Sequence, residues 1–107
     1  MLVSEFVNEK SKQLVFYLEA YWADNIAFKE LDGFIWDVLE EWTNIKNAER
    51  QVYSHRERIF WHVLYQVQFV GGHSLRHEDS VRSELQLYTL YLKEDTPCTL
   101  DVVGMRP

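Results

Sequence analysis

Two arginines and a histidine lie close together near the middle of the chain, at Arg56, Arg58 and His62. Arg58 and His62 are four residues apart, a spacing that places two side chains on the same face of a helix. A guanidinium can bind a phosphate, and an imidazole can give or take a proton near neutral pH. Together, these residue types could act on a phosphodiester.

Arg58 precedes His62 by four residues and Arg56 precedes it by six, and this arrangement resembles the minimal motif of the HEPN ribonucleases, a family of helical-bundle proteins. The resemblance covers only these few residues, and Glu57 stands where that family often has a polar amide. It implies metal-independent cleavage of RNA by Arg56 or Arg58 together with His62. The alternative, which we favour from the sequence, is that both arginines are solvated charges and that His62 lies near the edge of the core.

The histidines do not form a metal-binding pattern. His55 and His62 are two helical turns apart, roughly 10 Å in rise, which is too far for two ligands of one ion. His73 and His77 have the four-residue spacing that suits a metal on a helix, but two glycines directly precede them and favour a loop. We therefore expect ordinary histidines, with no metal and no other cofactor.

No other catalytic pattern stands out in the sequence. A glycine-rich phosphate loop is absent, because Gly71 and Gly72 lack the further glycines and the lysine that such a loop needs. Neighbouring carboxylates such as Glu40 and Glu41 point in different directions on a helix, whereas acid/base catalysis needs two groups that face one pocket. The sequence therefore favours a protein that is not an enzyme.

Length and composition indicate one packed domain. The chain has 107 residues, of which 47% are hydrophobic and 15% aromatic, which is enough for a core and too rich for a disordered chain. Cys98 is the only cysteine, so an intramolecular disulfide is impossible and a reducing compartment fits best. The start of the chain lacks a secretory signal, and no apolar stretch reaches the ~20 residues that a bilayer needs. We expect a cytoplasmic protein that begins near Met1 and does not associate with a membrane.

Apolar residues at steps of three and four predict the first two helices, over about 4–23 and 25–45. Ser4 is the expected N-cap of the first, and Asp24 or Asn25 the expected cap of the second. Gly33 interrupts the second pattern, so that helix could instead start only after residue 32.

A third helix is predicted over about 48–70, capped by Asn47 and ended by Gly71 and Gly72, one of them in a left-handed conformation. Its apolar residues include Val52, and its second half is apolar nearly all round, so we expect it to lie centrally. The segment after the glycine pair is expected to be a loop.

A fourth element starts at Asp79 or Ser80, and two interpretations of it stay open. Its apolar residues recur at helical steps, which favours a helix, but residues 85–92 are also rich in β-compatible types and could pair with 98–103 as a hairpin. The predicted fold is therefore an all-α bundle of four helices, or three helices plus a short C-terminal β-hairpin. In both cases 1–107 is a single helical domain, with 96–107 as an extended C-terminal tail.

The charge is unevenly distributed along the chain. Residues 1–45 carry nine acids against three lysines, whereas residues 46–82 carry six basic residues against four acids. Nucleic-acid binding normally shows a concentrated basic face, so we expect no nucleic-acid partner. Solvated acidic helix faces would explain the same charges, and a basic protein is the partner that would suit them.

Aromatic residues are plentiful in the same acidic half. Trp and Tyr are favoured anchors of protein interfaces. The residues that we predict to bind a partner are Trp22, Trp36, Glu40, Glu41 and Trp42. Core packing alone would also explain these aromatics. A homodimer through the Trp-bearing faces is compatible both with an interaction module and with a ribonuclease. The sequence thus predicts a small acidic helical protein that acts as a protein–protein interaction or regulatory module.

Overall fold

The structure, a computed structural model, describes residues 1–94 and 104–107. Over these residues it contains four α-helices and one short 3-10 turn. They are α1 (Val3–Trp22), α2 (Phe28–Trp42), η1 (Ala48–Arg50), α3 (His55–His77) and α4 (Asp79–Glu94). The predicted all-α bundle of four helices is confirmed.

The hairpin alternative is wrong where the structure describes it, because 85–94 continue α4 as a helix. The apolar steps of this segment therefore outweigh its β-compatible residue types. The other half of the expected hairpin, Cys98 and most of the predicted tail lie outside the described residues.

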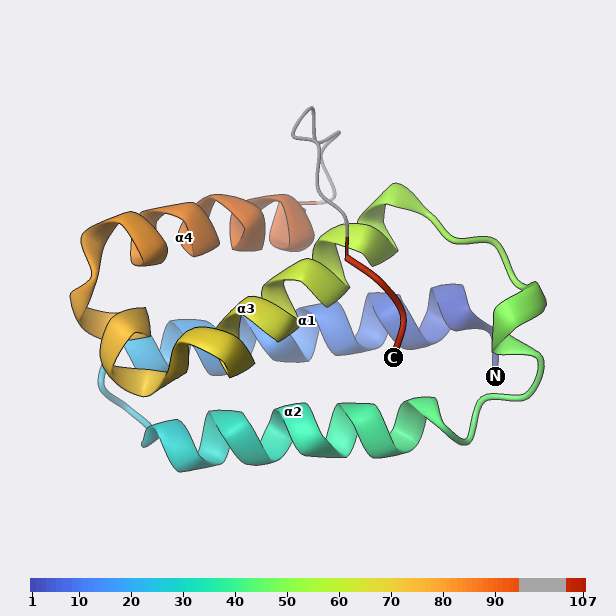
Figure 1. Cartoon of the computed structure of the whole chain (residues 1–107), viewed down its shortest axis with the longest axis horizontal. Coiled ribbons are helices and arrows are strands. Elements are labelled where there is room, and N and C mark those ends of the chain that lie inside the picture. Colours follow the sequence, from blue (N-terminus) through green and yellow to red (C-terminus); the bar gives the residue numbers. More distant parts are fainter. Residues whose placement is uncertain (95–103) are drawn as a thin grey trace.

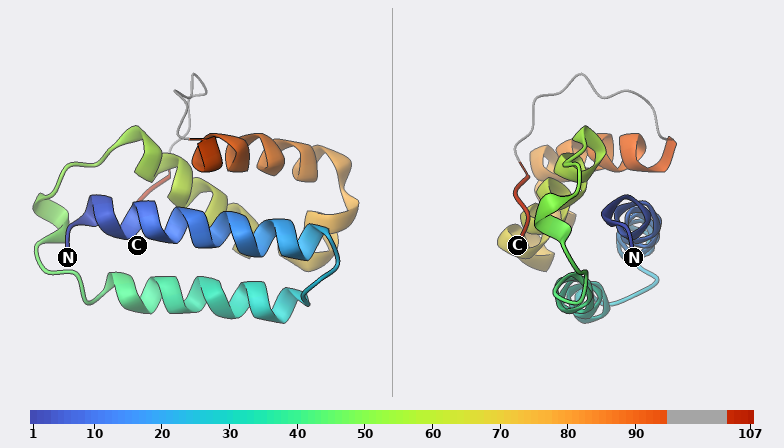
Figure 2. Two further views of the ribbon diagram at one scale, coloured as in Figure 1. Left: turned by 180° about the vertical axis from the view of Figure 1, so that it is seen from behind. Right: turned by 90° about the vertical axis from the view of Figure 1, so that its right-hand side faces the viewer.

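The helices form a bundle in which α1 and α3 are central (Figure 1). Helix α2 runs beside α1, α3 crosses α1 obliquely, and α4 lies on the opposite side of the bundle from α2 (Figures 1 and 2). The last residues of the chain return to lie alongside α3 (Figure 1). This arrangement leaves one long side of α2 outside the packed interior.

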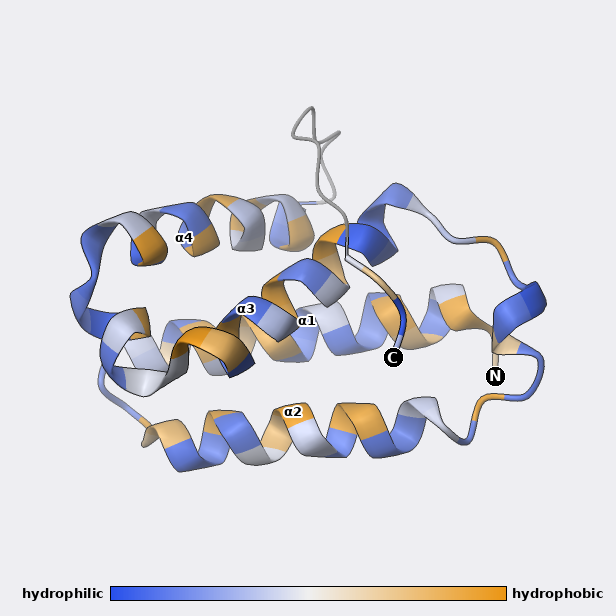
Figure 3. Ribbon diagram, in the orientation of Figure 1, coloured by the Kyte–Doolittle hydropathy of each residue, from blue (hydrophilic) through white to orange (hydrophobic). Residues whose placement is uncertain are grey.

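Each helix buries one side. Hydrophobic and hydrophilic residues alternate along the helices, as expected for helices that pack on one face and meet water on the other (Figure 3). The interior includes three fully buried aromatic side chains and a set of aliphatic ones. The largest are Trp61, Phe6, Phe60, Leu14, Leu18, Leu31, Ile35, Leu64, Leu75, Leu85 and Leu92. No helix in the described part of the chain has the length and apolar composition needed to cross a bilayer.

The starts of α1 and α2 differ from the predicted ones. The N-cap of α1 is Leu2 rather than Ser4, and the N–H of Val3 donates to Oε1 of Gln51 at 2.6 Å, so a distant side chain supplies the cap. Helix α2 starts after Ala27 rather than at a polar cap, and it runs unbroken through Gly33. A helix start after residue 32 is therefore wrong, because the buried side of the helix already begins at Leu31.

The start of α3 is also later than predicted. Asn47 does not cap a helix but adopts a positive φ of 58° ahead of η1, and the chain then becomes extended at Gln51. Val52, expected on the buried stripe, is 86% exposed. The cap is Ser54, whose Oγ accepts the N–H of Glu57 at 3.1 Å. Residues 48–54 carry apolar side chains at helical steps, yet their backbone forms a turn and a connection.

The glycine pair interrupts α3 at Gly71, as predicted, and a second helical segment follows within the same element. Gly71 has φ 74° and ψ 178°, so the predicted break with a positive φ occurs there. The chain then resumes as a helix to His77, and the expected loop at His73 and His77 is wrong. Gly72 permits this course, since a Cβ there would lie 2.9 Å from Cγ of Phe28.

Candidate functional site

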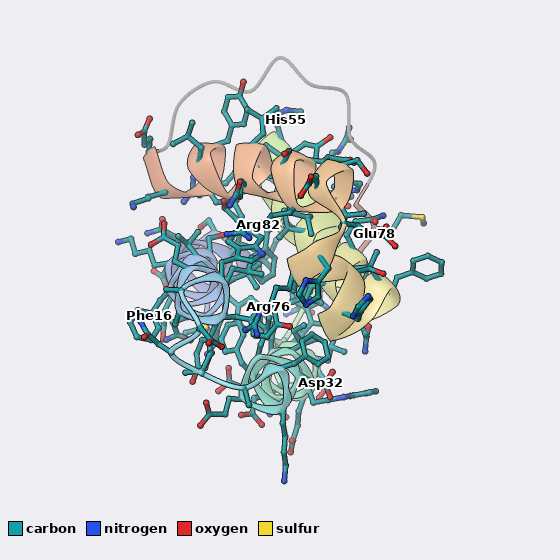
Figure 4. The ribbon with its side chains drawn as sticks, turned by 90° about the vertical axis from the view of Figure 1, so that its left-hand side faces the viewer. Phe16, Asp32, His55, Arg76, Glu78 and Arg82 are labelled. Atoms are coloured by element: carbon teal, nitrogen blue, oxygen red, sulfur yellow. The ribbon has the colours of Figure 1, made fainter. Side chains whose placement is uncertain are left out.

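Helix α2 presents an exposed surface that is acidic around a single tryptophan. Trp36 is 58% exposed and lies on the side of the helix opposite its buried residues. Asp32 and Glu40 lie one turn before and one turn after Trp36, Asp37 directly follows it, and we call these four residues the acidic α2 face. Figure 4 shows Asp32 on the outer side of the helix. The helix as a whole carries five acids and one lysine.

The other predicted interface tryptophans have structural partners. Trp42 is only 8% exposed and packs in the core, with its ring centroid 5.8 Å from that of Phe6 and 5.1 Å from that of Trp61. Trp22 is partly buried, and its Nε1–H donates to the carbonyl of Leu75 at 3.1 Å. Of the three predicted tryptophans, Trp36 is therefore the one that a partner could reach in this conformation.

The two predicted interface glutamates differ in their surroundings. Glu40 is exposed on the acidic α2 face. Glu41 lies at the border of that face and forms an ion pair with Lys10 of α1. The ion pair joins α2 to α1 at the edge of the acidic α2 face. Because Glu41 is exposed, we expect this pair to stabilise the fold only weakly.

Arg56, Arg58 and His62 contact different parts of the molecule. Arg56 donates from Nη2 to the carbonyl of Leu92 at the end of α4, at 2.6 Å. Arg58 places its guanidinium 5.1 Å from the centroid of the Tyr53 ring. The His62 ring meets Tyr88, in the middle of α4, edge-on with centroids 4.9 Å apart. These contacts link α3 to α4 and to the connection before α3.

Burial lowers the pKa of His62, because the charged imidazolium loses hydration, while Glu84 raises it in opposition. The Nε2 atom of His62 lies 3.9 Å from Oε1 of Glu84, which is too long for a hydrogen bond. The imidazole is therefore neutral at pH 7. It packs between helices α3 and α4.

A buried ion pair that could not be predicted from the sequence joins the end of the chain to the start of α3. Glu57 is 1% exposed, and its carboxylate accepts two hydrogen bonds from Arg106, at 2.5 Å from Nε and 2.8 Å from Nη2. Its Oε2 also accepts Nε1–H of Trp61 at 2.9 Å. We call Glu57, Trp61 and Arg106 the Arg106 anchor.

The guanidinium of Arg106 uses its remaining donors on the backbone. It donates to the carbonyls of Ala48, Gln51 and Val52 at 2.8, 3.2 and 3.0 Å. The side chain of Arg106 is only 16% exposed. The Glu57 carboxylate raises the pKa of Arg106, chiefly through its hydrogen bonds. One side chain thus holds η1, the connection after it and the start of α3 together.

Gly104 allows the end of the chain to approach α3. A Cβ at this position would lie 2.0 Å from the carbonyl oxygen of Arg58 and 2.5 Å from the backbone nitrogen of His62. Only glycine fits such a close backbone contact. Because Gly104 lies two residues before Arg106, it places the guanidinium at the anchor.

One half of this anchor had a signal in the sequence. Ser54 and Glu57 form the S-x-x-E pattern that marks a helix start, and Ser54 is the cap in the structure, in place of the predicted Asn47. In the usual capping box the Glu turns back to the cap residue, whereas here Glu57 binds Arg106. No local pattern points to Arg106, since its partners lie about 50 residues away in the chain.

Two further observations bear on function. No group of three or more His, Cys, Asp or Glu side chains among residues 1–94 and 104–107 is arranged to hold a metal ion. No family model matches the sequence, and comparisons with curated proteins and with solved structures give no match.

Proposed function

We propose that this protein is an interaction module that binds a basic protein partner through the acidic α2 face. The observation that carries the proposal is Trp36, a large aromatic side chain 58% exposed in the middle of an acidic helix surface. The core does not need this side chain, since α2 is held by residues on its opposite side.

Trp36 has the properties of an interface anchor. Tryptophan is enriched among the residues that carry most of the binding energy at interfaces, because it buries a large area with few rotatable bonds. Gly33, one turn before it, is exposed and has no heavy atom within 4 Å of where a Cβ would lie. A partner side chain can therefore lie beside the Trp36 ring without meeting a neighbouring side chain at this position.

The charge around Trp36 selects the kind of partner. Asp32, Asp37 and Glu40 lie within four residues of Trp36 on the helix, and complementary charge speeds association and excludes partners of the same sign. Positive groups on the partner would lie over these carboxylates, and an apolar group would pack against the indole. The expected partner surface is thus basic with an exposed apolar residue.

A peptide-display selection tests this proposal with a defined probe. An unbiased peptide library is selected on the purified protein and counter-selected on Trp36→Ala. We expect enriched peptides that carry net positive charge and at least one large apolar residue. Their affinity should fall about 30-fold for Trp36→Ala, which corresponds to a hot spot of about 2 kcal/mol.

Two matched variants separate the contributions of charge and of the aromatic ring. Phe16→Ala removes another exposed aromatic, on α1, and should leave the affinity unchanged. Reversal of charge by Asp37→Lys with Glu40→Lys spares the Lys10–Glu41 ion pair and should weaken binding most at low salt. Enriched peptides that are neutral or acidic, or that bind Trp36→Ala as well as the natural protein, would contradict the proposal.

A further inference from the structure

Two histidine rings lie next to each other at the end of α3. His73 and His77 are one helical turn apart, both are exposed, and their ring centroids are 4.8 Å apart. The planes of the two rings are inclined by 40°. Both residues lie in the helical segment after Gly71. Two histidines four residues apart on a helix lie on one face, which is an arrangement that can bind a metal ion.

The helical segment that carries the two rings is held firmly by α1. The hydroxyl of Tyr21 donates to the carbonyl of Gly72 at 2.7 Å, and Nε1–H of Trp22 donates to the carbonyl of Leu75 at 3.1 Å. Leu75 is fully buried between these contacts. The backbone at His73 and His77 is therefore positioned in advance, which lowers the cost of ordering two ligands around one ion.

The charges nearby do not repel a cation. Arg76 lies between the two histidines in the sequence, but its guanidinium is held toward α1 by the carbonyl of Tyr21 at 2.9 Å and the carboxylate of Asp24 at 3.2 Å. Figure 4 shows Arg76 on the side of α3 that faces α1 and α2, away from Glu78. The rings also lie in the last turns of a helix, where the backbone dipole favours positive charge.

We propose that His73 and His77 together bind a borderline divalent transition-metal ion such as Zn²⁺ or Ni²⁺. Imidazole nitrogens are suitable ligands for these ions, and each binds zinc at about 2.0–2.1 Å. Two such nitrogens lie at most about 4 Å apart. The centroids of the two rings, 4.8 Å apart, are close to this separation. The site is open, with water in the remaining coordination positions.

The test is calorimetric titration of the full, untagged chain with zinc chloride or nickel chloride alone. We compare the natural protein with His73→Ala, His77→Ala and the control His55→Ala, which removes another exposed histidine at the opposite end of α3. Far-UV circular dichroism checks that each variant is folded. The altered histidines are on the surface, so the bundle should persist in all of them.

We expect either substitution in the pair to raise the metal Kd by at least about 10-fold, the lower end of the loss seen even for residues that only support a ligand. His55→Ala should leave the Kd unchanged. The inference is overturned if the natural protein binds neither ion at millimolar concentration, if a pair variant binds as tightly as the natural protein, or if His55→Ala loses as much affinity.

Discussion

The Arg106 anchor and the acidic α2 face use the same residue types in opposite environments. In the anchor, Glu57 is 1% exposed and accepts the indole N–H of Trp61 as well as two bonds from Arg106. On α2, Trp36 is 58% exposed among carboxylates that face water. Residue type alone therefore does not separate a buried structural cluster from an exposed acidic surface, whereas burial and hydrogen-bond partners do.

The energetic consequences of the two environments differ in kind. A buried carboxylate is costly unless it is paired and hydrogen-bonded, so each partner of Glu57 compensates a penalty that the fold has already incurred. Exposed carboxylates keep their hydration and contribute little to stability. Loss of the anchor should therefore destabilise the fold, and loss of the acidic α2 face should leave the fold intact and change binding.

The largest effect on stability is expected from Arg106→Ala. The substitution leaves Glu57 buried without its cation and frees three backbone carbonyls, which should lower the free energy of unfolding by about 3–5 kcal/mol. Urea denaturation measures the change. Lys93→Ala is the control, because it removes an exposed ion pair with Glu19 and should cost no more than about 1 kcal/mol. Equal losses in the two variants would remove the distinction between anchor and surface.

Gly104→Ala should have an intermediate effect. The added methyl group would press on the backbone of α3 at Arg58 and His62, and relief requires the end of the chain to shift. We expect a loss of about 1–3 kcal/mol, the range typical of overpacking. Thermal unfolding measures it, with Gly33→Ala as the comparison: a Cβ at Gly33 meets no atom within 4 Å, so that variant should instead gain up to about 1 kcal/mol from helix propensity. If Gly104→Ala unfolds at or above the natural temperature, the close approach of Gly104 does not hold the anchor in place.

A smaller effect concerns pH and His62, which lies beside Gly104. Burial lowers its pKa in the folded state, so the unfolded chain binds more protons as the pH falls through about 6.5. The stability contributed by neutral His62 is thus present above that pH and is lost below it. Urea denaturation at pH 7.5 and 5.5 should show a smaller loss for His62→Gln than for the natural protein. An identical loss in both would contradict the assignment.

The smallest effect on stability is expected from Trp36→Ala. Because the side chain is mostly exposed, the free energy of unfolding should change by no more than about 0.5 kcal/mol. Thermal unfolding monitored by circular dichroism measures it. A clear destabilisation would mean that Trp36 supports the fold, and it would remove the argument that the core leaves this side chain available.

Much of the fold could be predicted from the sequence, because helix-period apolar patterns are local. The pattern predicted helices over about 4–23, 25–45 and 48–70, and the structure has them at 3–22, 28–42 and 55–77, with the predicted glycine break at Gly71. The predicted first residue of a helix was less accurate where the capping group is distant in the sequence. The side chain of Gln51, for example, caps the start of α1. At 48–54 the same apolar steps, including Val52, occur in a turn and a connection.

The candidate site could be predicted only in part. The coincidence of acids and tryptophans directed attention to α2, but periodicity did not separate Trp42, which packs on Trp61, from Trp36, which is exposed. The Arg106 anchor could not be predicted from the sequence, because it depends on where the end of the chain packs against α3. His73 and His77 were predicted to lie in a loop because two glycines precede them. The helical segment that follows the glycines contacts Tyr21, Trp22 and Phe28, which are distant in the sequence.

Site-specific photo-crosslinking in the source cells tests most directly whether the acidic α2 face meets a basic partner. A photoreactive amino acid replaces Trp36 in one variant and Gln86, which is exposed on α4 across the bundle, in the other. We expect a discrete adduct with a basic protein from position 36 that is absent from position 86 and is reduced by Asp37→Lys with Glu40→Lys. Equal adducts from both positions, or an adduct at position 36 with a protein that is not basic, would contradict it.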